Sequence, residues 1–325
     1  MHPFINKYQD IIEYEFKDTF KYADTLEDAR SYQISYDGFK KMVQEKNNTI
    51  NEWDLPWLFE IAIFHYEYSF YAKFHLNNEI LWKEHLALAI NYGSVSLTST
   101  AQSCGCYEKR NPFIMIHKSV FMMSLVLLTS NEKEFDTIGN YLIDSLNGEG
   151  CIIKRGYNKA SISWFTLKLY SLYAKKKITL NPLLQPKDTY GYSKVLENWD
   201  TTDIKEITLY IELLCEIHIA QAQKDDDIYL KIKDDPEDLT YRELFLVSSY
   251  FFPYEVLTWL KLREKAGLKN PKTFTHPIMN TLIAKMFLDI KEPLPKPKEL
   301  PFAKELLEKL KEKCPNVEIP EWLDG

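Results

Sequence analysis

The chain has 325 residues, of which 45% are hydrophobic and 27% charged, and its formal net charge is −7. This is the composition of a globular protein, and the length is sufficient for a large buried core. The acidic balance and the scarcity of arginine argue against nucleic-acid binding, because arginine makes most bidentate contacts to phosphates and bases. The start of the chain lacks a basic segment followed by an apolar one, and no stretch reaches roughly 18 consecutive apolar residues. We therefore expect neither a signal peptide nor a membrane-spanning helix.

The first half of the chain is predicted to fold into successive helices. Apolar residues recur there at helical spacing, and the low glycine content favours long helices over short strands. Asn78 is expected to open one helix, whose second part is rich in small residues and should cross a neighbour closely. A turn with a short extended segment is expected at residues 147–155. The expected helices cover residues 3–46, where two are predicted, and residues 51–76, 78–101, 112–128, 130–146 and 161–176.

The least regular part of the sequence, residues 177–200, predicts a boundary between an N-terminal helical half, 1–190, and a C-terminal helical half, 191–325. A single compact domain stays open as an alternative. The C-terminal half is expected to contain an acidic turn, a proline-rich connector at 291–301 and a last short helix. Its helices are expected at 202–223 and 236–251, then one ending at Gly267, one opened by His276-Pro277, and 302–313. The predicted fold class is all-α, as a multi-helix bundle or an irregular α-solenoid of ten or more helices.

The five cysteines are an odd number, and Cys215 lies within an apolar helical run. This usage predicts buried free thiols in a reducing compartment rather than a disulfide framework. We therefore expect a cytoplasmic protein. The five are Cys104, Cys106, Cys151, Cys215 and Cys314.

Catalytic signatures are sparse. The sequence contains no glycine-rich phosphate loop, no G-x-S-x-G nucleophile elbow and no H-E-x-x-H zinc motif. His65, His75 and His85 recur every ten residues, which turns successive side chains about 80° apart on a helix and is poor geometry for one metal ion. They are expected to bond to neighbouring groups instead. We accordingly predict a protein that is not an enzyme, with no catalytic residue, no metal ligand and no cofactor.

One motif competes with that prediction. Asp234, Asp235 and Asp238 match the D-D-x-x-D spacing with which helical terpenoid synthases hold Mg²⁺ for a diphosphate. A Mg²⁺-dependent, diphosphate-processing enzyme is therefore an alternative function. Helix capping explains the same residues, since Pro236 suits a first helical turn and Glu237 and Asp238 favour the positive end of the helix dipole. No second acidic motif is present to complete a metal site.

The same stretch is strongly acidic. Residues 225–238 contain seven acidic residues and two lysines, a net charge of −5. Concentrated charge between two helices suits a surface that steers a basic partner. The predicted partner-binding residues are Asp225, Asp226, Asp227, Asp234, Asp235, Glu237 and Asp238.

The C-terminal half also resembles a known family. It has a helix with aromatic and small residues (210–222), an acidic turn ending in Asp235-Pro236, an apolar helix (244–252), a helix ending at Gly267 and a His-Pro-Ile-Met segment starting at His276. This pattern resembles the all-helical immunity protein 49 family of bacterial polymorphic toxin systems. The resemblance implies a non-enzymatic protein that binds and occludes one cognate toxin, with no catalytic residues to carry over. Another helical immunity family and a general helical protein-interaction scaffold remain alternatives.

Overall fold

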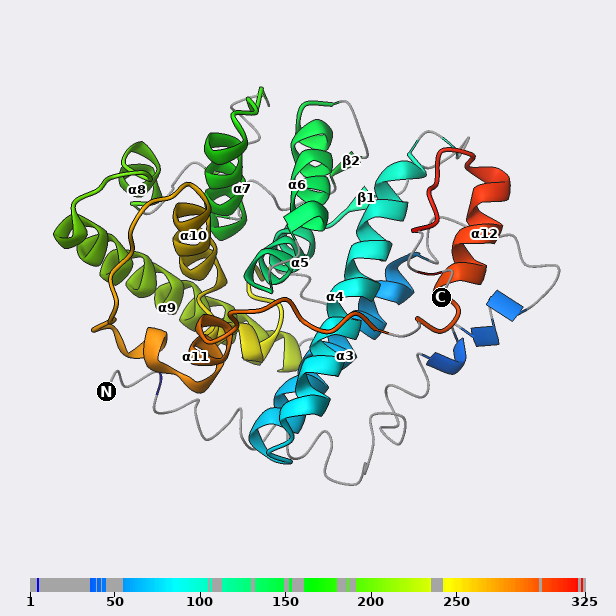
Figure 1. The fold of residues 1–325 in the computed structure, drawn as a ribbon, viewed down its shortest axis with the longest axis horizontal. Helices are drawn as coiled ribbons and strands as arrows, with labels where there is room; N and C mark the ends of the chain where they lie inside the picture. The colour runs from blue at the N-terminus through cyan, green and yellow to red at the C-terminus, as the bar shows by residue number, and fades with distance from the viewer. Residues whose placement is uncertain are drawn as a thin grey trace. The chain divides into compact units, whose positions relative to one another are not determined.

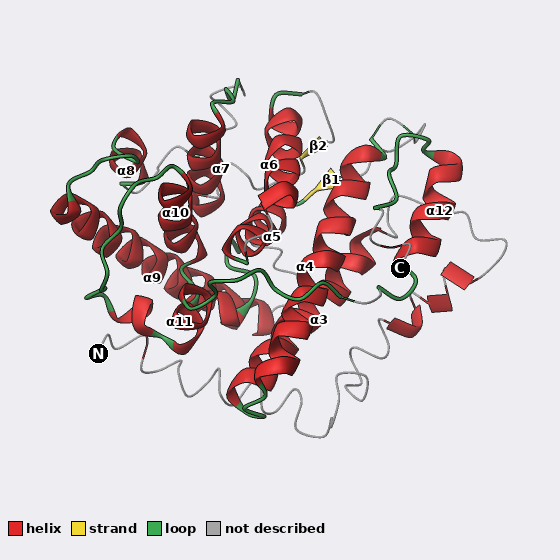
Figure 2. Cartoon of the chain, viewed as in Figure 1, coloured by secondary structure: helices red, strands yellow, loops and turns green. Residues whose placement is uncertain are grey.

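The computed structural model describes residues 5, 36–38, 40–41, 43–44, 55–104, 106, 113–129, 132–148, 152–153, 161–179, 186, 191–234, 242–297, 300–320 and 323. The elements with defined bounds are the α-helices α3 to α12, two 3₁₀ helices and two strands of two residues each (Figures 1 and 2), and residues 36–38, 40–41 and 43–44 are also helical. The all-α prediction is therefore confirmed. No helix in this part of the chain is both long and apolar enough to cross a membrane.

The chain divides into two compact units, each built from separate stretches. Unit 1 comprises Met1–Ile12, Met115–Asn147 and Ile153–Glu292, and unit 2 comprises Glu13–Ile114, Gly148–Ile152 and Pro293–Gly325. The boundary expected near residue 190 thus lies inside unit 1. The physical reason is that α5 and α7, from the first half of the chain, pack against α10 from the second half.

Unit 2 contains a long helical hairpin, α3 (Leu55–Phe74) and α4 (Glu79–Gln102) (Figure 1). Asn78 caps α4 as predicted, because its side chain accepts hydrogen bonds from the backbone N–H groups of Ile80 and Leu81. The small side chains of α4 allow the expected close crossing, and Ser96 donates a hydrogen bond to the carbonyl of Leu55 at 2.9 Å. The helix α12 (Ala303–Lys313) packs on α4.

Unit 1 is a group of mutually packed helices around α5 and α10. α5 is apolar on almost every side, and nearly all of its side chains are buried. The elements are α5 (Ile116–Leu128), α6 (Glu132–Leu146), α7 (Ser161–Ala174), α8 (Tyr192–Glu197), α9 (Ile204–Asp234), η4 (Val247–Phe251), α10 (Tyr254–Lys265), η5 (Pro277–Asn280) and α11 (Leu282–Leu288).

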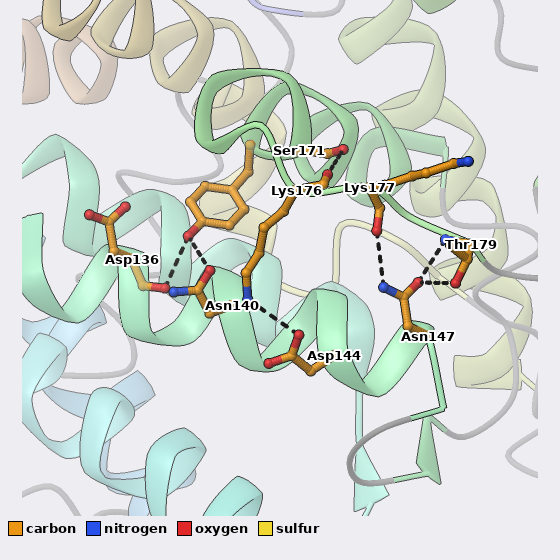
Figure 3. Close-up of polar contacts among 9 residues, drawn as sticks. Asp136, Asn140, Asp144, Asn147, Ser171, Lys176, Lys177 and Thr179 are labelled. Carbon is orange, nitrogen blue, oxygen red and sulfur yellow. Dashed lines mark hydrogen bonds and ion pairs between the residues drawn. The ribbon is translucent and has the colours of Figure 1, made fainter.

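Polar contacts join α6 to α7 and to the segment that follows α7 (Figure 3). The hydroxyl of Tyr170 donates to the carbonyl of Asp136 at 3.0 Å and to the side chain of Asn140 at 2.9 Å. The helices approach closely at Gly139, where an added Cβ would lie 2.5 Å from the Tyr170 ring. At the other end, Asn147 accepts from the backbone N–H of Thr179 at 2.7 Å. These bonds account for a polar face of α6 without invoking a ligand.

A buried arginine organises the segment between α8 and α9. The guanidinium of Arg263 donates to the carbonyls of Trp199 and Thr201, both at 2.7 Å, and to that of Lys269 at 3.0 Å. Its Nε donates to Asn270 at 3.0 Å. Backbone carbonyls thus take the place of the carboxylate that usually accompanies a buried arginine. The hydrogen bonds from Arg263 hold the segment between α8 and α9 in one conformation.

Several predicted elements differ in extent from the observed ones. The helix expected at 202–223 begins at Ile204 and continues to Asp234, and the helix expected at 112–128 begins only at Ile116. Before it, β1 (Phe113–Ile114) pairs with β2 (Ile152–Ile153), the short extended segment expected in 147–155. In the helix expected at 236–251, the described residues 242–246 are not helical and 247–251 form a 3₁₀ helix.

Other predicted signals are confirmed. Gly267 follows α10 with a φ of +77°, and His276 caps η5 by accepting from the N–H of Ile278. Residues 293–297 of the proline-rich connector form no helix or strand, as expected. Most of the helical region expected at 3–46 lies outside the described residues.

Candidate functional site

The predicted acidic surface is only partly at the surface. Asp225 is fully buried and Asp226 nearly so, while Asp227 is exposed. The prediction is therefore wrong for the first two, because a carboxyl group in the interior offers no charge to a partner. The reason is that α9 does not end at Gln223, so residues 225–227 lie on a helix with one face toward the core instead of in an open turn.

The remaining members of that surface are not placed. Asp235, Glu237 and Asp238 lie outside the described residues, and Asp234 is described only as the last residue of α9. Their roles as a partner-binding surface, a helix cap or Mg²⁺ ligands all stay predictions. Within the described part of the chain, no group of three or more His, Cys, Asp or Glu residues is arranged to hold a metal ion.

Asp225 holds the strap between α9 and α10, which we define as residues 242–253 and which contains the 3₁₀ helix η4 but no α-helix. Its carboxylate accepts from the backbone N–H groups of Leu244 at 2.7 Å and Glu243 at 3.1 Å, and from the side chain of Gln221 at 2.9 Å. Burial raises the pKa of Asp225, although these donors and the nearby Lys224 act against the shift. The buried carboxylate thus supplies the partners that helical geometry would otherwise provide to these N–H groups.

Glu243 extends this network from the strap to α7. It accepts from the backbone N–H of Ser163 at 2.7 Å and from the hydroxyl of Ser161 at 3.3 Å. Both donors belong to the first turn of α7, so Glu243 caps a helix from a distant part of the chain. Burial is the main cause that raises the pKa of Glu243 to about 8, and the neighbouring Asp225 adds to the shift. The carboxyl group is therefore largely protonated at neutral pH.

A histidine on α9 binds both the strap and α10. The Nδ1 atom of His218 lies 2.8 and 3.1 Å from the two carboxyl oxygens of Glu255, and Nε2 lies 3.0 Å from the carbonyl oxygen of Ser249. A carbonyl can only accept, so Nε2 carries a proton. One further proton lies between Nδ1 and the carboxyl group. We call His218, Asp225, Glu243 and Glu255 the buried acid cluster.

The chemistry open to this cluster is limited by its geometry. A histidine oriented by a carboxylate is the arrangement of a general base, but such a base needs its second nitrogen directed at a substrate. In His218 that nitrogen is bonded to Ser249, and both His218 and Glu255 are fully buried. The cluster accordingly acts as a set of internal ties that fix the strap to α7, α9 and α10.

The hydroxyl of Tyr192 lies beside the cluster and makes no hydrogen bond within the described residues. Tyr192 belongs to α8 and is 1% exposed. Burial raises its pKa well above the usual range, and the nearby carboxyl groups of Glu255 and Glu243 raise it further. An unbonded buried hydroxyl is destabilising by about 1–3 kcal/mol. The Tyr192 hydroxyl therefore lowers the stability of the fold at this position. It is not a reactive group, because the raised pKa keeps the phenol protonated.

The sequence analysis did not single out the buried acid cluster. A signal existed for its part on α9, since Leu214, His218, Gln221 and Asp225 recur at intervals of three and four residues and so continue the buried helix face. Glu243 and Glu255 carry no such signal, because their partners come from other parts of the chain.

The histidines of unit 2 confirm the prediction that they bond to neighbouring groups. The Nδ1 atoms of His65 and His85 lie 2.9 Å apart, and the His65 ring stacks on Tyr92 with centroids 5.6 Å apart. Burial, followed by the effect of His85, lowers the pKa of His65 well below its usual range. His65 is therefore neutral at physiological pH. The ring of His75 contacts Tyr71 instead of joining this pair.

The cysteines differ from the prediction at one position. Cys106, Cys215 and Cys314 are free thiols, and Cys215 is buried as expected. Cys104 is disulfide-bonded, so the prediction of a free thiol is wrong for this residue. Spacing along the sequence could not reveal it, because a disulfide depends on which cysteines the fold brings together. Cys151 lies outside the described residues.

Comparison with known proteins adds no family to this description. No family model matches the chain, and neither a curated protein nor a solved structure matches it.

Proposed function

We propose that this protein is a non-enzymatic immunity protein that binds a basic bacterial toxin and neutralises it by occlusion. The observation that supports the proposal is that the histidine and carboxyl groups of the buried acid cluster bind other groups of the protein. His218, Glu243 and Glu255 are buried and bonded to backbone or side-chain groups of the protein itself. These three side chains therefore stabilise the fold, and we propose that the protein acts by binding through its surface.

Charge and sequence pattern support the same proposal. The net charge of −7 suits a basic partner, and acidic side chains such as Glu216 and Asp227 occupy the exposed face of α9. The resemblance of the C-terminal half to the immunity protein 49 family supplies the kind of partner. Inhibition by occlusion needs complementary shape and charge and no catalytic group.

The proposal is tested by protection. The gene is co-expressed in bacteria with a candidate toxin gene taken from its genomic neighbourhood, and growth is compared with that of cells that express the toxin alone. Protection is expected, together with a stable complex when the two purified proteins are mixed. Cells that die equally in both cultures, with no complex in vitro, would overturn the proposal.

The diphosphate-processing alternative depends on Asp234, Asp235 and Asp238 acting together on Mg²⁺. A thermal-shift measurement with Mg²⁺ and pyrophosphate separates the two functions. An immunity protein is expected to show no stabilisation, whereas a Mg²⁺–diphosphate site would raise the Tm by mass action.

Residence in the cytoplasm is a separate part of the proposal. Disulfides are rare in that reducing compartment. Differential alkylation of thiols in intact cells would report the state of Cys104. A cytoplasmic location requires that the disulfide of Cys104 is reduced in cells, and a stable disulfide at this position in cells would contradict that location.

A further inference from the structure

The outer face of α9 carries an unusual combination of apolar and acidic side chains. Leu209, Leu213 and Ile217 follow one another at intervals of four residues, so they form one line along the helix. Leu209 is 68% exposed, and the other two are partly exposed. We call these three residues the apolar stripe.

Acidic residues surround the apolar stripe. Glu212 and Glu216 lie on the same helix face as Leu209, at intervals of three and seven residues, and Glu206 precedes it by three. Two lysines lie among them, so residues 194–216 carry a net charge of −4, more than half of the chain total of −7. We call the acidic residues the acidic rim: Glu197, Asp200, Asp203, Glu206, Glu212 and Glu216.

Hydrogen-bond partners orient three of the rim carboxylates. Glu206 accepts from the hydroxyls of Thr201 at 2.6 Å and Tyr210 at 2.7 Å, which hold the pKa of its carboxyl below the usual range. Glu212 accepts from Thr275, and Glu216 faces the Nε2 atom of His276 at 3.1 Å. Among the ion pairs of the described residues, none joins a rim carboxylate to a lysine or arginine.

Helix capping accounts for only part of this arrangement. Asp203 accepts from the N–H of Lys205, and Glu206 lies in the first turn, so both favour the positive end of the helix dipole. Glu212 and Glu216 lie two turns or more farther along, where that effect has faded. Neither capping nor core packing explains the 68% exposure of Leu209.

We infer that the apolar stripe and acidic rim of α9 form the docking surface for the basic partner, with an apolar side chain of that partner on Leu209. This inference rests on the proposed function. An apolar centre within a polar rim is the usual composition of a protein interface, and the net negative charge of the rim favours a basic surface. The surface replaces the predicted one at residues 225–227, of which two are buried.

The test uses an exposed position, so that folding is preserved. Leu209→Arg removes the apolar centre and places a positive charge inside the rim. The matched control is Leu282→Arg on α11, where the leucine is 58% exposed in the same unit. Isothermal titration with the toxin domain encoded beside the gene is expected to show a Kd raised about tenfold or more for Leu209→Arg. Leu282→Arg should stay within about twofold of the unmodified protein.

A second variant isolates the charge. Glu212→Gln combined with Glu216→Gln keeps acceptor oxygens for Thr275 and His276 but removes two negative charges. Its matched control is Glu264→Gln, an exposed carboxylate of α10 in the same unit that is not part of the rim. Weaker binding at low ionic strength is expected for the double variant alone, with the difference shrinking as salt is added.

The outcomes separate this inference from the proposed function. If the toxin binds and neither stripe nor rim variants change its affinity, the docking surface is elsewhere although the function stands. If that toxin does not bind at all, the proposed function fails, and a synthetic amphipathic helix of leucine and lysine becomes the probe. Binding that Leu209→Arg weakens and Leu282→Arg does not would still support the surface. Absent or unaffected binding of the peptide would overturn it.

Discussion

The two faces of α9 use the same residue types in opposite ways. On the inner face, His218 and Asp225 are fully buried, and their polar atoms bind other groups of unit 1. On the outer face, Glu216 is exposed and Glu212 partly exposed, beside the exposed Leu209. A carboxylate therefore reveals its role only through its position on the helix, since burial makes it a structural tie and exposure makes it part of a surface.

The largest effect on stability is expected from breaking the histidine–carboxyl pair. His218→Leu leaves the Glu255 carboxyl group buried without its partner, which should destabilise the fold by about 3–5 kcal/mol. Urea unfolding measures the change. The double variant His218→Leu, Glu255→Leu should recover part of the loss, because it removes the stranded carboxyl group. Equal loss in both variants would show that the pair itself is not the source.

Removal of Asp225 should cause the next largest loss of stability. Asp225→Ala leaves the buried N–H groups of Glu243 and Leu244 without an acceptor, a loss of about 2–4 kcal/mol. Asp227→Ala, two residues away on the exposed side, should change stability by less than about 0.5 kcal/mol. Comparable effects at the two positions would remove the distinction between the inner and outer faces.

Glu243 predicts a dependence on pH. Its pKa is raised from about 4.5 to about 8 on folding, so the folded protein retains a proton that the unfolded chain releases in this interval. The stabilising contribution is complete below about pH 4.5 and is lost as the pH rises toward 8. Glu243→Gln mimics the protonated form and should be more stable than the unmodified protein at pH 9 by about 4 kcal/mol, but not at pH 5. A constant difference across that range would contradict the assignment.

The smallest effect on stability is expected at Leu209. Its side chain is exposed, so Leu209→Arg should change the free energy of unfolding by less than about 0.5 kcal/mol. Urea unfolding measured beside Leu282→Arg provides the check. A loss of more than 1 kcal/mol at Leu209 alone would mean that this leucine packs against the fold and is not free for a partner.

Local signals in the sequence predicted much of the fold. Asn78, Gly267 and His276 mark helix ends through their own backbone or side-chain chemistry, and the structure confirms all three. The sequence analysis ended α9 at Gln223, although the helix continues to Asp234. A run of acidic residues predicts a solvent-exposed turn when the groups that contact them are unknown. Asp225 is stable there only because residues 243 and 244 return to it across 18 and 19 positions of sequence.

The candidate sites show the same limit. Charge composition indicated an acidic protein with a basic partner, but the position of the acidic surface depends on which face of α9 is buried. The free-thiol prediction was wrong at Cys104 because disulfide pairing also depends on contacts between distant residues. The sequence predicted interactions between residues within one helical turn, but it did not predict interactions between distant segments of the chain.

Hydrogen exchange tests the contrast between the two faces of α9 most directly. Amide exchange of the protein is followed by mass spectrometry, alone and with the toxin domain encoded beside its gene. We expect added protection in the segment from Glu197 to Ile217, with none in the strap at residues 242–253. Protection of the strap without protection of residues 197–217, or no protection anywhere, would contradict the assignment of binding to the outer face.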